Sequence, residues 1–115
     1  MVDPISLENV APSELMITSR RDADALVLSL SGELDLSSSP VLEKELDAMA
    51  VDGSVRVVID LGGLEFMDSS GLQMLLRARE RATENDLDFS LVRGRPGVHR
   101  VFELTRTDEL FAFED

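Results

Sequence analysis

The feature that most constrains the fold is the apolar run at residues 55–61, Val-Arg-Val-Val-Ile-Asp-Leu. A nearly continuous β-branched run of this length is typical of a strand covered on both faces, as strands in parallel sheets are. Parallel strands need crossover connections, which are usually helices, so helices should alternate with strands around this segment. Gly62 and Gly63 follow the run, and we expect them to end the strand.

The rest of the chain supplies that alternation. Apolar patterning predicts strands at residues 14–19 and 25–30, joined by a polar turn at 21–24 into a hairpin at one edge of the sheet. Serines before Pro40 predict a helix start at 37–40, and a second helix should begin at Ser69 or Ser70. A fourth strand at 87–91, a short helix that carries Val98 and Phe102, and a final short strand at 110–113 complete the order.

This order predicts an α/β fold. We expect a single domain with a mixed, mainly parallel β-sheet, an N-terminal β-hairpin and α-helices packed against the sheet. A length of 115 residues suffices for one such domain. Residues 14–115 should form the domain, and residues 1–13 should be a loose N-terminal extension.

Charge and composition limit the partners. The formal net charge of −12 would repel phosphate backbones and anionic lipid headgroups, so we expect neither nucleic-acid binding nor direct membrane binding. Such a surface suits a basic protein partner, although solubility alone also explains it. The chain has no cysteine for disulfides or thiolate metal sites. Its apolar runs are too short to span a membrane and its start lacks a signal-peptide pattern, so we expect a cytoplasmic protein.

Two distant segments should meet at one edge of the sheet. The carboxyl ends of neighbouring parallel strands lie along one edge, where functional loops gather. Glu33 and Asp35 follow the second predicted strand, and Asp68, Ser69 and Ser70 follow the buried strand. The topology should therefore bring these residues together as one acidic surface, which we refer to as the rim.

The rim offers little to a catalytic mechanism. His99 is the single histidine and is expected on the surface of a short helix. A catalytic triad would require His99 to reach Ser69, and nothing in the sequence positions a third group or an oxyanion hole. Asp35, Asp60 and Asp68 are isolated acids rather than a metal-binding pattern. We therefore expect a protein that is not an enzyme and that holds no cofactor or metal.

A hydroxyl at a helix start has two uses, and the residues alone leave both open at Ser69 and Ser70. Its oxygen can accept a hydrogen bond from the first turn and so cap the helix. A phosphate at the same place meets unpaired N–H groups and the positive end of the helix dipole, so the fold should tolerate it. Phosphorylation of Ser69 would add about −1.5 to −2 charges to the acidic rim. A partner that had packed against the hydroxyl would then face a poorly paired dianion.

The helix predicted after Ser69 has an unusually wide apolar arc. One face carries Gly71, Leu75, Ala78 and Ala82, and a neighbouring face carries Leu72, Leu76 and Arg79. Together they exceed the stripe of about 100° that a surface helix usually buries. Either the sheet covers both faces, which is the simpler interpretation, or the second face contacts a partner.

Three blocks of the sequence carry a family resemblance. They are Gly-Glu-Leu-Asp at residues 32–35, Phe-Met-Asp-Ser-Ser-Gly-Leu at 66–72 with the strand before it, and Val-Phe-Glu-Leu-Thr at 101–105. Together they resemble the STAS domain family, in particular the bacterial anti-sigma factor antagonists, over roughly residues 15–113. The middle block is the most specific. Two residues depart from the family pattern, because Gln73 and Arg106 stand where the family commonly has glycine.

The resemblance implies a partner-switching protein. In this family the unmodified antagonist binds an anti-sigma factor, usually a serine kinase of the GHKL class, and a sigma factor is released. The kinase uses ATP to phosphorylate the serine after the aspartate, here Ser69, and a metal-dependent serine phosphatase reverses the modification. By the same match we expect a partner-binding surface that comprises Glu33, Asp35, Asp68, Ser69, Ser70, Gly71, Leu72 and Leu76.

The resemblance also separates the roles of the two serines. Ser69 is the residue expected to be phosphorylated, and Ser70 is expected to be the structural cap of the helix. An alternative within the same family is a stand-alone STAS subunit of a membrane transporter or a signalling scaffold, which would share the fold and need no phosphorylation. The intact Asp68-Ser69 pair favours the antagonist.

Overall fold

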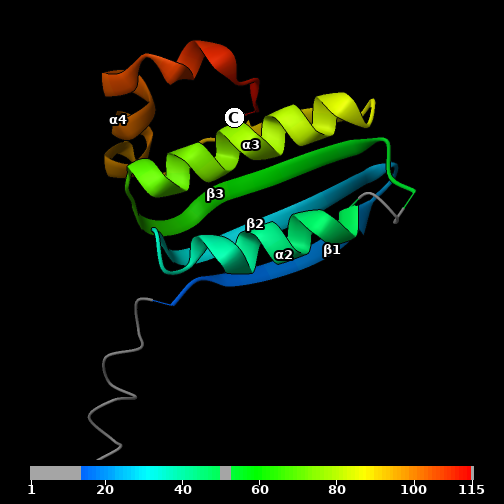
Figure 1. Ribbon diagram of the computed structural model, residues 1–115, viewed down its shortest axis with the longest axis horizontal. Helices are drawn as coiled ribbons and strands as arrows, with labels where there is room; N and C mark the ends of the chain where they lie inside the picture. Colours follow the sequence, from blue (N-terminus) through cyan, green and yellow to red (C-terminus); the bar gives the residue numbers. More distant parts are fainter. Residues whose placement is uncertain (1–13, 50–52, 115) are drawn as a thin grey trace, which may run out of the picture.

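Five strands form one sheet in the order β1-β2-β3-β4-β5, with helices packed against it (Figure 1). The structure is a computed structural model that describes residues 14–49 and 53–114, so the predicted extension at residues 1–13 lies outside the described residues. The strands are β1 (Met16–Asp22), β2 (Ala25–Leu34), β3 (Arg56–Met67), β4 (Asp88–Val92) and β5 (Phe113–Glu114). The helices are α2 (Ser39–Met49), α3 (Ser69–Glu84), α4 (Pro96–Thr105) and the short 3-10 helix η2 (Thr107–Leu110).

The sheet has the predicted mixed topology. β1 pairs with β2 in the antiparallel sense, from Met16 opposite Ser31 to Asp22 opposite Ala25, which makes the hairpin at one edge. β2 with β3, β3 with β4, and β4 with β5 are parallel pairs. Helices connect β2 to β3 and β3 to β4, as parallel neighbours require.

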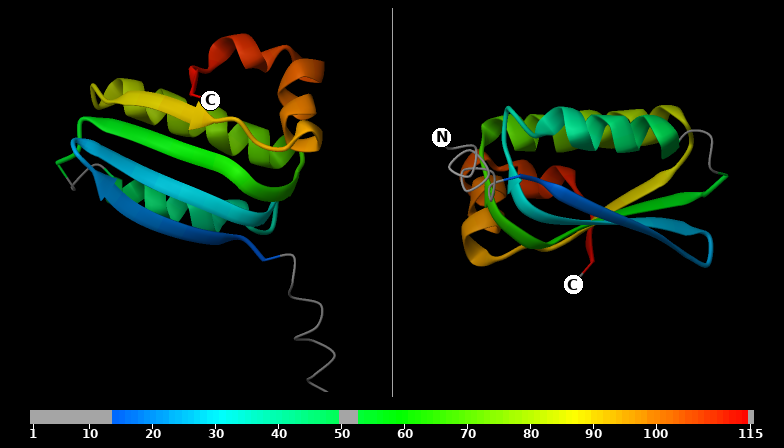
Figure 2. Two further views of the ribbon diagram at one scale, coloured as in Figure 1. Left: turned by 180° about the vertical axis from the view of Figure 1, so that it is seen from behind. Right: turned by 90° about the horizontal axis from the view of Figure 1, so that it is seen from below.

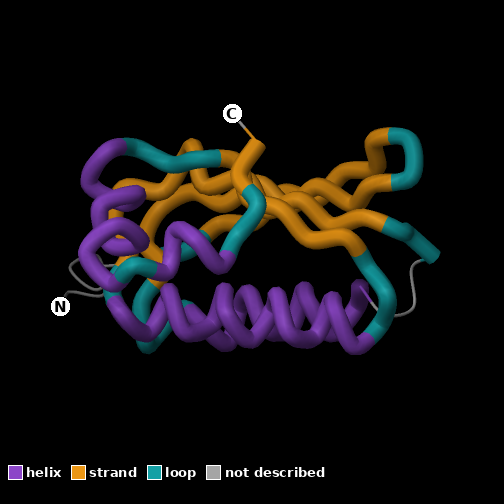
Figure 3. Tube along the Cα trace, turned by 90° about the horizontal axis from the view of Figure 1, so that it is seen from above, coloured by secondary structure: helices purple, strands orange, loops and turns teal. Residues whose placement is uncertain are grey.

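The main core lies between the sheet and the helices. α2 and α3 run side by side over one face of the sheet, whereas α4 sits at one end of it (Figure 2). Figure 3 shows the same layering along the chain trace, with the opposite face of the sheet free of helices. Val57, Ile59 and Leu61 of the predicted buried strand are at most 1% exposed. Leu72 is also buried and Leu76 is partly buried against the core, which favours the simpler interpretation for this face of α3.

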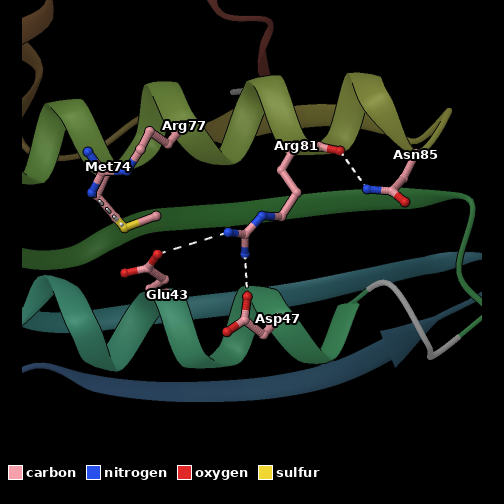
Figure 4. Close-up of polar contacts among 6 residues, drawn as sticks. All are labelled: Glu43, Asp47, Met74, Arg77, Arg81 and Asn85. Atoms are coloured by element: carbon pink, nitrogen blue, oxygen red, sulfur yellow. Dashed lines mark hydrogen bonds and ion pairs between the residues drawn. The ribbon is translucent and has the colours of Figure 1, made fainter.

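α2 and α3 are also joined along their outer edge. Arg81 of α3 contacts Asp47 of α2 at 2.6 Å between Nη1 and Oδ1, and it lies 3.9 Å from Glu43 (Figure 4). The carbonyl oxygen of Arg81 accepts a hydrogen bond from the side-chain amide of Asn85 at the end of the helix. Such partly exposed ion pairs contribute little free energy, so burial rather than charge holds the two helices together.

The two central strands are longer than the sequence predicted. β3 continues through Gly62 and Gly63, which were expected to end it, because β2 runs alongside and supplies hydrogen bonds as far as Met67. Ser29 pairs with Asp60 but Ser31 pairs with Gly63, so β3 carries an extra residue there, as in a β-bulge. A Cβ atom at Gly63 would lie 2.7 Å from the carbonyl oxygen of Leu30, so glycine permits the close approach of the strands. The prediction of a break was therefore wrong.

The C-terminal segment differs from the prediction at His99. This residue was expected on the surface but is 6% exposed. Its ring packs edge-on against Phe113, with 5.0 Å between ring centroids, and lies 5.8 Å from the ring of Phe102. The expected strand at 110–113 shrinks to β5, because η2 precedes it and Phe111 turns into the core beside Phe102. Aromatic packing between distant residues decides this part of the fold.

Helix α3 begins at Ser69, but neither serine caps it. The N-cap is Asp68, which has extended backbone angles (φ −110°, ψ −171°). Its Oδ1 accepts hydrogen bonds from the backbone N–H groups of Ser70, at 2.9 Å, and Gly71, at 3.1 Å. The expectation that Ser70 is the cap was wrong, because both serines already have helical geometry and the cap is the residue before the first helical one.

Helix α4 ends without the glycine that is common in the family. Arg106 takes the left-handed conformation itself, with φ of 62°. Its backbone N–H donates to the carbonyl oxygen of Glu103 at 3.1 Å and so satisfies one of the free groups at the helix end. An L-residue pays a steric cost in this conformation, so the helix end is strained at Arg106.

Removing the cap of α3 should destabilise the protein. Asp68→Ala leaves two N–H groups of the first turn without their acceptor and is expected to lower the free energy of unfolding by about 1 kcal/mol. Asp68→Asn keeps an acceptor oxygen and should cost less. Urea unfolding followed by far-UV circular dichroism measures both, since the chain has no Trp or Tyr. Equal losses in the two variants would contradict the capping role.

Relieving the strain at the end of α4 should stabilise the protein. Arg106→Gly is expected to raise the free energy of unfolding by about 0.5–1 kcal/mol, because glycine adopts a φ of 62° without steric cost. The matched control is Arg100→Gly in the exposed interior of the same helix, which should lower it by about 1 kcal/mol. A decrease for Arg106→Gly would show that the Arg106 side chain makes a stabilising contact that outweighs the strain.

Candidate functional site

The structure brings the two predicted segments of the rim together. Leu34 is the last residue of β2 and pairs with Met67, the last residue of β3. The N–H of Asp68 donates to the carbonyl oxygen of Leu34 at 3.3 Å. A Cβ atom at Gly71 would lie 2.5 Å from the same oxygen, so a larger side chain would push the first turn of α3 away from β2. The start of α3 therefore rests directly on the end of β2.

A network of serine hydroxyls fixes the segment after β2. Oδ1 of Asp35 accepts hydrogen bonds from the hydroxyl of Ser37 at 2.9 Å and the N–H of Ser38 at 3.0 Å. The hydroxyl of Ser38 donates to the carbonyl oxygen of Glu33, and that of Ser39 donates to the carbonyl oxygen of Asp35. The hydrogen bond from Ser37, followed by that from the Ser38 backbone, lowers the pKa of Asp35 below its usual value. Asp35 thus stays ionised and holds its own loop in place.

Ser69 is the first residue of α3 and is exposed. Its hydroxyl has no hydrogen-bond partner within residues 14–49 and 53–114. The sequence led us to expect free N–H groups around it, but the N–H groups of Ser70 and Gly71 are already bonded to Asp68. A group attached to the Ser69 oxygen would therefore lie beside the Asp68 carboxylate and extend outward, rather than settle into the helix start.

The other predicted site residues divide into surface and interior. Glu33 lies within β2 rather than in a loop and, like Ser70, is partly exposed. Gly71 and Leu72 are buried, so their side-chain positions face the core and support the rim from within. Leu76 is partly buried and packs against the core. The exposed part of the predicted partner-binding surface is therefore narrower on α3 than the sequence indicated.

Sequence reasoning missed several exposed apolar residues near the rim. Leu36, directly after Asp35, is 75% exposed, and Val41 in the first turn of α2 is 46% exposed. Phe66, which pairs with Glu33, is also 46% exposed. Leu36 lies outside every helix and strand that the sequence predicted. An apolar residue in such a loop was the one sequence signal that could have identified it as exposed. These side chains add apolar area to an acidic edge.

His99 and the acidic residues are the side chains that a metal or catalytic site would draw on. Within the described residues, no three histidine or acidic side chains come together as a metal site. His99 packs against aromatic rings, and its Nε2 lies 3.9 Å from Oε2 of Glu103. Among those same residues, no helix has the length and apolar character that crossing a membrane demands.

Comparisons with known proteins agree with the fold. A family model described as "Mlab, STAS domain" matches residues 17–112. The chain is 30% identical to the anti-sigma-F factor antagonist RsfB of Mycobacterium tuberculosis over 101 residues, which cover 88% of this chain and 82% of RsfB. It is 29% identical to the anti-sigma-B factor antagonist of Staphylococcus aureus over 83 residues, 72% of this chain and 77% of that protein.

A solved structure shows the same likeness in three dimensions. The crystal structure of an anti-sigma factor antagonist from Mycobacterium paratuberculosis superposes with a TM-score of 0.80 and 32% identity, over 90% of this chain and 87% of that one. With the family model spanning most of the chain and relatives alike in sequence and structure, this chain belongs to the STAS domain family.

Proposed function

We propose that this protein is an anti-sigma factor antagonist whose rim binds an anti-sigma factor and whose binding ends when Ser69 is phosphorylated. The observation that carries this proposal is the exposed hydroxyl of Ser69, held at the first position of α3 by the Asp68 cap. The relatives in sequence and in structure are named anti-sigma factor antagonists, which favours this function over a transporter or scaffold subunit.

The unmodified rim can be covered by a partner at modest cost. The Ser69 hydroxyl is neutral and small, and the Asp35 carboxylate is already hydrogen-bonded within its own loop. A basic surface of the anti-sigma factor would be attracted by the net charge of −12. The partner would then need to desolvate few unpaired groups around Ser69.

Phosphorylation of Ser69 would raise the free-energy cost of covering the rim with a partner. The phosphate would add about −1.5 to −2 charges beside Asp68. Since Asp68 already occupies the N–H groups of Ser70 and Gly71, the phosphate would remain directed at the partner. Burying a poorly paired dianion costs several kcal/mol, and about 3 kcal/mol corresponds to roughly 100-fold weaker binding. The fold should be unaffected, because the Ser69 side chain is exposed and does not cap the helix.

The proposal assigns the catalytic steps to the partners. A GHKL-class anti-sigma kinase would transfer the phosphoryl group from ATP to the Ser69 oxygen, and a serine phosphatase would remove it, both in the cytoplasm. The antagonist itself would act as substrate and binding protein rather than as an enzyme.

The direct test is phosphorylation by the anti-sigma kinases of the same organism. The purified protein is incubated with each kinase and ATP, and intact mass and peptide mapping then report the number and position of phosphoryl groups. We expect one phosphoryl group on Ser69, and we expect Ser70→Ala to be modified in the same way. Failure of every such kinase to modify Ser69 would refute the proposed switch.

Substitutions at Ser69 should separate binding from folding. Ser69→Ala is expected to bind the anti-sigma factor like the parent and to resist release by ATP. Ser69→Asp places a charge at the phosphorylation site and should bind about tenfold more weakly or worse, with an unchanged circular dichroism spectrum. Thr83→Asp adds the same charge at the exposed far end of α3 and serves as the control. Calorimetric titration measures the affinities, and parent-like binding by Ser69→Asp would contradict the electrostatic account.

A further inference from the structure

A recess opens beside the rim, on the side of β1 and α2. It has a volume of about 310 Å³, and Glu14, Leu15, Ser37, Ser38 and Val41 line it. Leu36, which directly precedes Ser37, is 75% exposed. Large apolar side chains that remain exposed beside a recess are typical of interaction surfaces.

The recess has a defined shape and charge. Leu15 is 7% exposed and belongs to the core, so it forms an apolar wall, and Val41 adds a second one. The hydroxyl of Ser37 bonds to the Asp35 carboxylate, whose lowered pKa keeps it ionised. Glu14 contributes another acidic residue to the lining. Apolar walls with carboxylates close by match a side chain that has an apolar stem and a cationic tip, such as arginine or lysine.

The loop that borders the recess is rigid enough to serve as a binding element. Ser38 and Ser39 are buried and bond to backbone oxygens at Glu33 and Asp35. A Cβ atom at Gly32 would clash with the carbonyl oxygen of Glu14, so β2 and the segment before β1 are in direct contact. The recess is therefore formed before any partner binds, which reduces the entropy lost on binding.

We propose that Leu36 and this recess form a second anchor point for the anti-sigma factor, which inserts an arginine or lysine there beside an apolar residue that packs on Leu36. This inference rests on the proposed function and extends the binding surface from Ser69 across the β2–α2 loop to the start of β1. Contact at this point does not involve Ser69, so it would contribute to affinity in the unphosphorylated protein and help to distinguish the correct anti-sigma factor from others.

The experiment measures affinity of the unphosphorylated full chain for its anti-sigma factor by calorimetric titration. Leu36→Ala should weaken binding about tenfold. Val41→Lys should weaken binding by at least as much, because it places a cation where the inserted arginine or lysine would lie, and it should keep the fold because Val41 is exposed. Glu14→Gln should weaken binding at low salt and have a smaller effect at high salt, because screening removes the attraction of the carboxylate for the cation.

Matched controls lie away from the recess. Leu104→Ala removes a side chain that is 72% exposed, against 75% for Leu36, and should leave affinity unchanged. Val55→Lys alters a valine that is 52% exposed, against 46% for Val41, at the opposite end of the sheet and should also have no effect. Equal losses in Leu36→Ala and Leu104→Ala would overturn the inference.

Failure of this inference can be told apart from failure of the proposed function. If the parent binds and Ser69→Asp weakens binding, while Leu36→Ala and Val41→Lys bind like the parent, the second anchor is refuted and the phosphorylation switch stands. If the parent binds none of the anti-sigma factors of its organism, both are refuted. If Leu36→Ala instead lowers the free energy of unfolding by urea, the chain itself covers Leu36, and the inference is wrong.

Discussion

β2 and β3 remain paired up to Leu34 and Met67, although two glycines interrupt β3 on the way. This pairing brings the backbone of Leu34 under the first turn of α3, where it accepts a hydrogen bond from Asp68 and contacts Gly71 closely. Without the extra length of the two strands, the segment after β2 and the start of α3 would lie apart. The rim exists because backbone hydrogen bonds to a neighbouring strand outweigh the local tendency of glycine to end a strand.

Asp68 has a structural role and an electrostatic one. Its carboxylate satisfies two N–H groups of the first turn, which leaves the Ser69 side chain free of any structural task. The same carboxylate occupies the donors that would otherwise hold an anion at the helix start. A phosphate on Ser69 would therefore face the partner instead of being hydrogen-bonded by the first turn of the helix. In the proposed switch, this arrangement would let phosphorylation change binding without changing the fold.

The binding surface that follows from this geometry combines acidic and apolar groups. Asp35 is fixed by Ser37 and Ser38, and Leu36 projects from the same loop into solvent. Charge attracts a basic partner over a distance, whereas apolar contact supplies most of the free energy once water is excluded. In the proposed switch, phosphorylation of Ser69 would act on the first of these terms, so the apolar contacts would need no change.

The sequence alone determined the architecture. The apolar run at residues 55–61 required a covered strand, and the alternation of helices around it required parallel neighbours, which places Asp35 and Ser69 at the same edge. Burial of α3 and the hairpin at the edge of the sheet also followed from apolar periodicity. These features were predictable because they depend on many residues that share one pattern.

Tertiary structure decided what depends on single residues. Whether Gly62 and Gly63 end a strand depends on β2, which lies far away in the sequence. His99 is buried because Phe113 folds back onto it, and Asp68 rather than Ser70 caps α3 because the chain turns helical two residues earlier than a cap at Ser70 implies. The exposure of Leu36 likewise depends on which elements pack over its loop. Periodicity averages over a segment, whereas each of these outcomes is set by a few individual contacts.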